Sequence, residues 1–404
     1  MASEPSQVES FPVTGVRCSA IAAGVRYADR LDLVLIELAE QSRTAAVFTR
    51  NAFCAAPVQI ARQNLHNMQP RYLLVNTGNA NAGTGEQGLE HARTCCEAVA
   101  SLAGCDADAV LPFSTGVIGE PLPVTRITDG VPAALKGLNA DNWPDAARGI
   151  MTTDTRPKLA SVQLALGGKT VTVSGIAKGA GMIKPDMATM LAFVFTDLKI
   201  NQARLQQLLL DSVNNSFNRI TVDGDTSTND ACTLSATGET GIELESLSAS
   251  EQAEFCRALD TVFGQLARGL IRDAEGASKF ITVRISGGRS SAECLKVAYT
   301  IAESPLVKTA MFASDPNWGR ILAAIGRAGI EDLEIDRVTI RLGETLIVEH
   351  GGVAASYQEE AGQREMDAKE IEVGVQLGRG ESEELVWTSD LSHEYVRINA
   401  EYRS

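Results

Sequence analysis

The sequence lacks the residue patterns from which metal centres and disulfide frameworks are built. Its 404 residues include eight cysteines, none of them in a C-x-x-C pair, and four histidines, none within metal-ligand spacing of another. Structural zinc sites and disulfide scaffolds both need closer and more regular spacing. We therefore expect no metal site and a location in the reducing cytoplasm.

Positive charge and long apolar runs are also scarce. Lysine and arginine number 36 against 51 aspartates and glutamates, which gives a formal net charge of −15. Nucleic-acid-binding proteins concentrate basic surface, so no nucleic-acid partner is expected. No apolar run approaches the roughly 20 residues that span a bilayer, and the start, MASEPSQVESFPVTG, lacks the basic and apolar regions of a signal peptide. The sequence predicts no membrane association, and it allows a small anionic substrate held by one or two local cations.

The apolar residues that are present, 44% of the total, form short runs and helical stripes. A chain of this length is expected to contain two or three domains or lobes. Helices are predicted over 86–102, from about Asn201, and over 249–272, where Ser248 and Glu251 match a capping box. Strands are predicted at 31–36, 71–76, 279–285, 337–342, 345–350, 370–377 and 384–389. This mixture predicts an α/β or α+β fold.

One motif suggests a nucleotide site. Residues 83–88, GTGEQG, match the G-x-G-x-x-G fingerprint of dinucleotide-binding proteins and precede a predicted helix. In that fingerprint the first glycine ends the strand, whereas here TGNANA separates the predicted strand end near Asn76 from Gly83. A capping box formed by Thr84 and Gln87 explains the same letters better. A nucleotide-dependent oxidoreductase is therefore kept only as a minor alternative.

The central segment places a threonine where flexible backbone meets an apolar strand. SGIAKGAGMIKPDMA, residues 174–188, is followed by TMLAFVF, which predicts a buried strand. An N-terminal threonine is a nucleophile that carries its own base, the α-amine, whose pKa is about 7.7–8.0. Thr189 would expose that amine by attacking the carbonyl carbon of the small Ala188 and breaking the peptide bond. The alternative is a non-catalytic binding protein in which this segment is a linker.

Two further segments fit such chemistry. FSTGVIG, residues 113–119, offers Thr115 and Gly116 in an expected compact turn, suited to donating hydrogen bonds to an oxyanion. TVDGDTSTND, residues 221–230, is acidic, but its spacing does not match that of a calcium-binding EF-hand loop. We expect this second segment to form a hydrogen-bonded wall near the site.

Six segments, in this order, together resemble one family. They are STGVIG, MTTDTRPK, GIAKGAGMIKPDMATMLAF, TVDGDTSTND, SPLVKTAMFASDPNWGRILAAIGRAG and YVRINAEYRS. The combination resembles the bacterial ornithine acetyltransferase family, also called glutamate N-acetyltransferase, from about residue 10 to the C-terminus. The resemblance implies a layered αββα core, similar in architecture to N-terminal-nucleophile hydrolases but differently connected, with additional α/β elements.

The resemblance also implies an activity. A precursor would cut itself between Ala188 and Thr189 into an α chain, 1–188, and a β chain, 189–404, which stay together and commonly form a heterotetramer of two α and two β chains. The enzyme would move an acetyl group from N2-acetyl-L-ornithine to L-glutamate in the cyclic arginine pathway, through an acetyl-threonine and without a coenzyme. Some members also use acetyl-CoA, which is therefore a candidate co-substrate. An amidase or aminopeptidase, with water as the acceptor, is the alternative within the same chemistry.

Residue roles follow from the resemblance position by position. Thr189 matches the nucleophile, and Thr115 and Gly116 match the oxyanion-stabilising pair. A lysine offers a point charge for a substrate α-carboxylate, and a glutamate can hold the side-chain ammonium of ornithine. The matched substrate-binding positions are Thr152, Lys178, Thr189, Glu275, Asn399 and Ser404.

Overall fold

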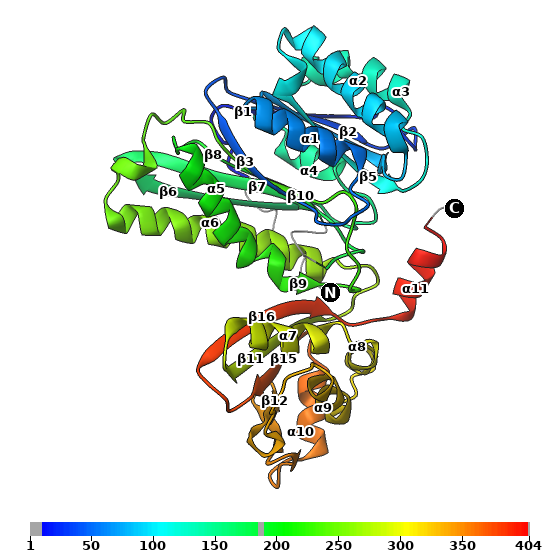
Figure 1. Cartoon of the computed structure of the whole chain (residues 1–404), viewed down its shortest axis with the longest axis vertical. Coiled ribbons are helices and arrows are strands. Elements are labelled where there is room, and N and C mark those ends of the chain that lie inside the picture. Colours follow the sequence, from blue (N-terminus) through cyan, green and yellow to red (C-terminus); the bar gives the residue numbers. More distant parts are fainter. Residues whose placement is uncertain (1–9, 185–189, 403–404) are drawn as a thin grey trace. The chain divides into compact units, whose positions relative to one another are not determined.

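The computed structural model describes residues 10–184 and 190–402, which form two compact units (Figure 1). Unit 1 contains residues 10–179, 190–218 and 226–270, and unit 2 contains residues 180–184, 219–225 and 271–402. The two units agree with the two or three domains or lobes that the chain length predicts. Among the helices in the described ranges, none combines the length and the apolar character needed to cross a membrane.

Two sheets form the centre of unit 1. The first has the order β1-β2-β4-β5, in which only β4 and β5 pair in parallel. The second has the order β3-β10-β8-β7-β6, in which only β10 and β8 pair in parallel. The strands are β1 (Val16–Ile21), β2 (Leu33–Leu38), β3 (Arg43–Phe48), β4 (Tyr72–Asn79), β5 (Val110–Val117), β6 (Lys158–Leu166), β7 (Lys169–Lys178), β8 (Leu191–Thr196) and β10 (Ala231–Ala236).

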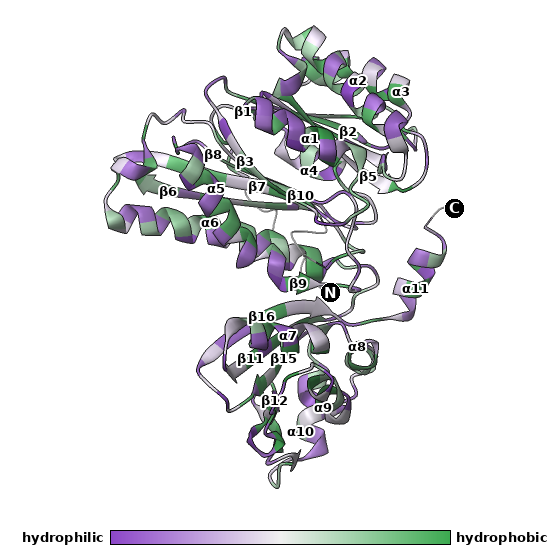
Figure 2. Cartoon of the chain, viewed as in Figure 1, coloured by the Kyte–Doolittle hydropathy of each residue, from purple (hydrophilic) through white to green (hydrophobic). Residues whose placement is uncertain are grey.

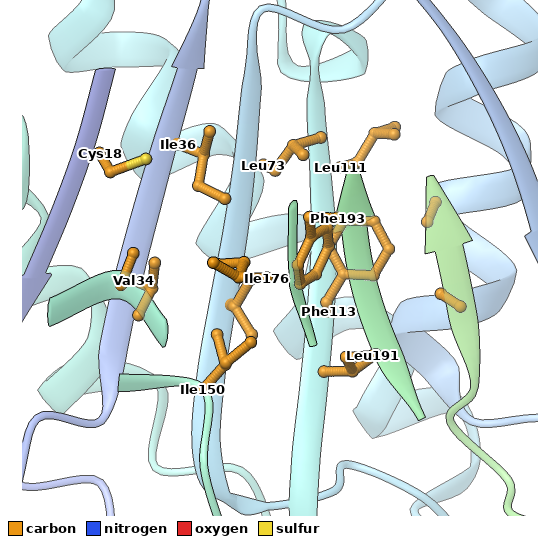
Figure 3. Close-up of a cluster of buried hydrophobic side chains, with 14 of the residues drawn as sticks. Cys18, Val34, Ile36, Leu73, Leu111, Phe113, Ile150, Ile176, Leu191 and Phe193 are labelled. Atoms are coloured by element: carbon orange, nitrogen blue, oxygen red, sulfur yellow. The ribbon is translucent and has the colours of Figure 1, made fainter. Parts of the chain in front are cut away.

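The two sheets pack face to face through an apolar core (Figure 3). The rings of Phe113 on β5 and Phe193 on β8 meet edge to face with their centroids 5.0 Å apart. Burying a side chain of this size stabilises the fold by about 1.5–3 kcal/mol. This contact fixes β5 relative to β8, and Thr115 and Gly116, which are expected to stabilise an oxyanion, lie on β5 itself.

Helices cover the outer faces of both sheets in unit 1. An apolar cluster joins α2 and α3 to β2 and β4 on the first sheet, while on the second sheet Gly175 of β7 lies against Leu266 of α6. The order helix, sheet, sheet, helix confirms the predicted layered αββα core. The helices are α1 (Ala56–Asn67), α2 (Gly85–Ala103), α3 (Val124–Lys136), α4 (Trp143–Gly149), α5 (Gln202–Asn214) and α6 (Ala249–Arg272), of which α6 reaches two residues into unit 2.

The predicted starts of α5 and α6 are confirmed by their caps. The Asn201 side chain accepts a hydrogen bond from the backbone N–H of Arg204 at 2.9 Å. Ser248 and Glu251 exchange the two hydrogen bonds of a capping box, 3.0 and 3.4 Å long. Figure 2 shows hydrophilic and hydrophobic residues alternating along α6, as expected for a helix with one buried face.

The capping box expected at Thr84 and Gln87 is wrong. Helix α2 does begin at Gly85, but its N-cap Thr84 makes no side-chain capping bond and instead donates its hydroxyl to the side chain of Asn81 at 2.9 Å. Strand β4 also extends to Asn79, three residues past the predicted end. Asn81 holds the start of this helix instead, because its amide also donates to Gly88 O at 2.9 Å.

Unit 2 is built on a mixed seven-stranded sheet with the order β14-β13-β12-β15-β11-β16-β9. Helices α7, α9 and α10 pack on it through one apolar cluster, which confirms the additional α/β elements. The strands are β9 (Ile220–Thr221), β11 (Phe280–Gly288), β12 (Thr339–Leu342), β13 (Thr345–Glu349), β14 (Gly352–Val353), β15 (Glu370–Gln376) and β16 (Ser382–Ser389). The helices are α7 (Ser291–Ala302), α8 (Pro305–Phe312), α9 (Trp318–Gly326), α10 (Glu359–Met366) and α11 (His393–Ala400).

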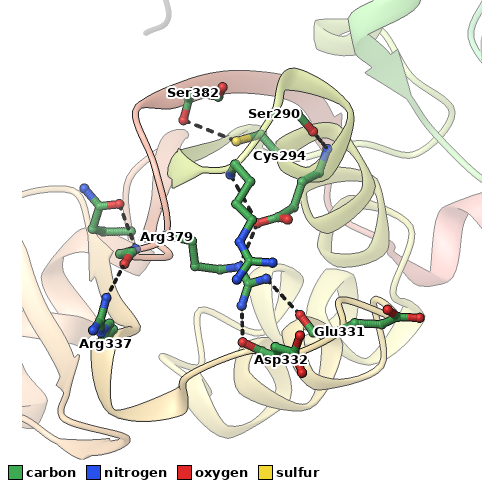
Figure 4. Close-up of polar contacts among 11 residues, drawn as sticks. Ser290, Cys294, Glu331, Asp332, Arg337, Arg379 and Ser382 are labelled. Carbon is green, nitrogen blue, oxygen red and sulfur yellow. Dashed lines mark hydrogen bonds and ion pairs between the residues drawn. The ribbon is translucent and has the colours of Figure 1, made fainter.

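A buried arginine secures the turn between β15 and β16 (Figure 4). The Arg379 side chain is 3% exposed, and its guanidinium pairs with Glu293 of α7 at 3.0 Å. It also donates to the backbone oxygens of Glu331 and Asp332. Hydrogen bonds from a charged donor are stronger than neutral ones, so three separate segments of unit 2 are held at one point.

Candidate active site

Thr115 and Gly116 lie at the end of β5, next to β4. The ladder between the two strands shifts register at Gly78 and Asn79, an irregularity of the kind that a β-bulge produces. The compact turn expected at residues 113–119 is therefore wrong, because residues up to Val117 are in the strand. Bulges redirect side chains at strand ends and are common beside active sites.

The backbone at Gly116 allows glycine alone. Its φ is +136°, a conformation that other residues rarely adopt. A Cβ built there would also lie less than 3.0 Å from the backbone of Gly78 and Asn79, closer than real Cβ atoms approach. The close approach of the two strands thus fixes where the N–H of this residue lies relative to Thr115.

Lys178, the last residue of β7, is joined directly to Thr115. Its ammonium donates to the Thr115 hydroxyl oxygen at 2.8 Å, and the two residues are only 9% and 8% exposed. Because that oxygen accepts a hydrogen bond from the lysine ammonium, the hydroxyl keeps its own hydrogen for donation to another group. The structure therefore places a cation and a hydroxyl donor at the same point.

Asp154 organises the polar residues around Lys178, and sequence reasoning did not single it out. Its buried carboxylate accepts hydrogen bonds from the backbone N–H groups of Thr152 at 3.0 Å and Gly179 at 2.8 Å, and it pairs with Lys158. Burial opposes ionisation of Asp154, but Lys158, Lys178 and the Gly179 N–H outweigh it and hold the pKa of this carboxyl below its usual value. The sequence feature that could have identified Asp154 is its position in MTTDTRPK, four residues before a lysine.

The expected hydrogen-bonded wall is present at Asn229. The side-chain amide of this residue donates to Ala80 O at 2.6 Å and to Ser114 O at 2.9 Å, directly before Thr115. The amide thereby links the loop after β4 to the end of β5. The part of the prediction that concerns Asn229 is confirmed.

The predicted cleavage site, Ala188 and Thr189, lies outside the described residues. The chain is described again from Met190, whose carbonyl accepts a hydrogen bond from Ala231 N–H at 3.0 Å. The next residue, Leu191, pairs with Lys178 across the antiparallel ladder of β7 and β8. The position two residues after the predicted nucleophile is therefore fixed beside the lysine.

Two of the predicted substrate-binding residues meet in unit 2. The Asn399 side chain, on α11, donates to the Glu275 carboxylate at 2.7 Å. Glu275 follows the end of α6 and is 7% exposed, so its carboxylate is buried although it lies at a helix end. Ser404 lies outside the described residues.

Asp223 has a role other than the hydrogen-bonded wall that was expected of residues 221–230. Its carboxylate accepts hydrogen bonds from Met182 N–H at 2.6 Å, from Ile183 N–H at 3.0 Å and from the Tyr395 hydroxyl at 3.2 Å. It therefore holds the segment Ala180–Lys184 against α11 within unit 2. Within residues 10–184 and 190–402, no three His, Cys, Asp or Glu side chains gather in a way that could hold a metal ion.

Comparison with known proteins gives a consistent result over nearly the whole length. The family model described as ArgJ family matches residues 17–404. Proteins named arginine biosynthesis bifunctional protein ArgJ from Pseudomonas syringae pv. tomato and Pseudomonas fluorescens are 54% and 53% identical over 394 residues. Each alignment covers 97% of this chain and 97% of the relative.

Two solved structures of relatives are similar to parts of this chain. A crystal structure of argJ from Bacillus halodurans is 38% identical, covers 52% of this chain and 99% of that chain, and has a TM-score of 0.49. A crystal structure of ornithine acetyltransferase from Mycobacterium tuberculosis, complexed with ornithine, is 36% identical, covers 44% and 94% of the two chains, and has a TM-score of 0.41.

Proposed function

The chain belongs to the ArgJ family, and on that premise we propose that it is a self-cleaving acetyltransferase. It moves the acetyl group of N2-acetyl-L-ornithine to L-glutamate and releases L-ornithine and N-acetyl-L-glutamate. The observation that carries the proposal is the buried contact between Lys178 and Thr115, beside the start of β8. Three further observations support the same site. They are the family membership of the chain, the ladder between β7 and β8, and the place of Thr189 in the sequence, two residues before β8 begins.

Self-cleavage begins when the Thr189 hydroxyl oxygen attacks the carbonyl carbon of Ala188. The peptide bond becomes an ester, and the former amide nitrogen becomes the α-amine of Thr189. Water then hydrolyses the ester, which leaves a carboxylate on Ala188 and restores the hydroxyl. The tetrahedral oxyanion of each step needs hydrogen-bond donors, and the Thr115 hydroxyl and the Gly116 N–H supply them.

Acetyl transfer uses the amine that cleavage releases. The amine accepts the hydroxyl proton as the Thr189 oxygen attacks the acetyl carbonyl of acetylornithine, and the proton passes to ornithine as it leaves. The acetyl group is now an ester on Thr189. The amino group of glutamate attacks this ester, N-acetylglutamate leaves, and the hydroxyl regains its proton.

Two buried charged groups each complement the charge of one group on the substrates. Lys178 supplies a buried cation for a substrate α-carboxylate, and Asp154 with Lys158 holds its surroundings in place. Glu275 supplies a carboxylate for the side-chain ammonium of ornithine, which has three N–H donors. The other proposed substrate-binding residues are Thr152, Thr189, Asn399 and Ser404.

The strand order explains how two chains would stay together after the cut. Strands β8 and β10 belong to the proposed β chain and lie between β3 and β7 of the proposed α chain, in one hydrogen-bonded sheet. Separating the chains would break two complete strand ladders and expose the core around Phe193. We propose that the resulting pair assembles further into a heterotetramer with two copies of each chain.

Two measurements test this proposal. Purified protein is expected to give two bands of nearly equal size on a denaturing gel, one of them with the N-terminal sequence TMLAF. Incubation with acetylornithine and glutamate is expected to yield ornithine and N-acetylglutamate in equal amounts. Release of free acetate that does not depend on glutamate would instead indicate a hydrolase. A parallel assay with acetyl-CoA and glutamate decides whether acetyl-CoA is a second acetyl donor.

Replacing Thr115 by alanine tests the oxyanion contact. Loss of one such donor typically slows a reaction by 100- to 1,000-fold, so we expect self-cleavage or acetyl transfer to slow by about 100-fold. Thr125→Ala, at an exposed position on α3, is the matched control and should behave as wild type. Unchanged rates of both steps in Thr115→Ala would reject the assignment.

A further inference from the structure

The Glu275 carboxylate lies directly over a glycine of the segment Ala180–Lys184. The backbones are tied together at this point, because Glu275 N–H donates to Ala180 O at 2.9 Å. A Cβ built on Gly181 would lie less than 3.0 Å from Oε2, Cδ and Oε1 of Glu275, which are the three atoms nearest to it. The carboxylate thus occupies the space that a side chain at position 181 would need.

The backbone at Gly181 does not itself require glycine. Gly181 is absent from the glycines with a positive φ, whereas the neighbouring Gly276 has a φ of +68°. A Cβ at Gly276 would also meet the backbone N of Tyr395. Gly276 is therefore needed for the fold, but Gly181 is needed only so that the end of one flexible side chain can stay where it is.

The carboxylate in that space is suited to a cation. A carboxylate can accept about four hydrogen bonds. Among the described residues, its partner is the Asn399 amide at 2.7 Å. Glu275 is also buried, and a buried carboxylate is costly unless a cation or further donors compensate it. A primary ammonium group, with three N–H donors, provides both.

We propose that Gly181 is a specificity-determining position, which selects donors with a side-chain ammonium by leaving room for the Glu275 carboxylate. The inference rests on the proposed function, because it assigns a residue to the recognition of acetylornithine. A side chain at position 181 pushes the carboxylate away from its place beside Asn399. Recognition of the ammonium is then lost, while the chemistry at Thr189 is unchanged.

Gly181→Ala is the test, with two reactions measured on the same preparation. The first is acetyl transfer from acetylornithine to glutamate. The second is exchange of the acetyl group between N-acetylglutamate and isotopically labelled glutamate, which involves no side-chain ammonium. Rates are normalised to the fraction of chains that begin at Thr189, so that any change in self-cleavage is removed.

The expected result is a selective loss. A hydrogen bond to a charged group contributes about 1.5–3 kcal/mol, so kcat/KM for acetylornithine should fall by roughly 10- to 100-fold. The glutamate exchange should keep its wild-type rate. In a Glu275→Ala background, adding Gly181→Ala should cause no further loss, because the displaced group is already gone.

The control is Gly326→Ala in α9 of the same unit, where an added Cβ meets no atom within 4 Å. It should leave both reactions and the melting temperature unchanged. Equal loss of both reactions in Gly181→Ala, a wild-type rate with acetylornithine, or a further loss in the Glu275→Ala background would each overturn the inference. Failure of the wild-type protein to transfer acetyl groups from acetylornithine at all would instead overturn the proposed function.

Discussion

Thr189→Ala is expected to remain a single unbroken chain with no acetyltransferase activity. The substitution removes the oxygen that attacks Ala188, and without that attack the α-amine that serves as the base is never released. Removing a covalent nucleophile lowers kcat by on the order of a million-fold in well-studied enzymes, so activity should fall below detection. A denaturing gel and the acetylornithine assay measure the two effects.

Thr189→Ser separates the hydroxyl from the rest of the side chain. Serine keeps the attacking oxygen but loses the methyl group that restricts rotation about χ1. We expect slower cleavage and a reduced but measurable transfer rate. A Thr189→Ala protein that is cut at the same bond, or that transfers acetyl groups, would contradict the mechanism.

Asp154→Asn is expected to lower the free energy of unfolding of unit 1 by roughly 3–5 kcal/mol, the range for removing one partner of a buried ion pair. The amide keeps the size of the side chain but leaves Lys158 and Lys178 buried without their shared counter-charge. Calorimetric melting measures the effect. The substitution is best made in the Thr189→Ala background, so that every variant is a single uncut chain.

Asp145→Asn is the matched control for this substitution. Asp145 pairs with Arg148 in the same unit, but both side chains are more than half exposed, at 51% and 57%. Exposed pairs contribute little, and the expected loss is below about 1 kcal/mol. Equal melting temperatures for the two variants would show that Asp154 does not hold the cluster together.

The Asp154 pair also predicts a pH dependence. The pKa of this carboxyl is lowered in the folded state, so its ionisation stabilises the fold at pH values above its unfolded pKa of about 3.9. That contribution disappears as the pH falls through the lower, folded pKa. The Asp154→Asn variant of the Thr189→Ala protein should differ from its parent in unfolding free energy by the whole amount at pH 7. This difference should shrink below about pH 4.

Strands and helices with regular apolar patterns were predictable from the sequence, and the capping residues at Asn201 and Ser248 located two helix starts. Strand β7 was missed because it is almost wholly buried but carries polar residues. These residues obscure the alternation of apolar and polar positions by which a strand is predicted. Tertiary partners satisfy them: Ser174 donates to Phe11 O at 2.6 Å, and Thr172 N–H donates to Asp197 at 2.9 Å. Such partners lie too far along the chain for a local pattern to reveal.

Thr189, Thr115 and Gly116 stood out in the sequence by their chemistry, and the other site residues came from the family resemblance. The structure adds how the described ones among them are held. No local spacing predicts that Lys178 reaches Thr115, because their contact depends on the packing of two sheets. The same holds for Gly181, which looks like one of several flexible glycines in the sequence. Its significance appears only when Glu275, 94 positions later, is seen to fill the space above it.

Strands β8 and β10 lie between strands that come from the other side of the proposed cut. This arrangement limits how the protein can fold. Before cleavage, β7 and β8 are joined by a short stretch of one polypeptide, and their pairing is a fast unimolecular event. After cleavage, the same ladder could be rebuilt only by the encounter of two separate fragments whose exposed strands also pair with wrong partners. A mature enzyme that is denatured should therefore regain activity in a concentration-dependent and incomplete manner, whereas the uncut Thr189→Ala chain should refold independently of dilution.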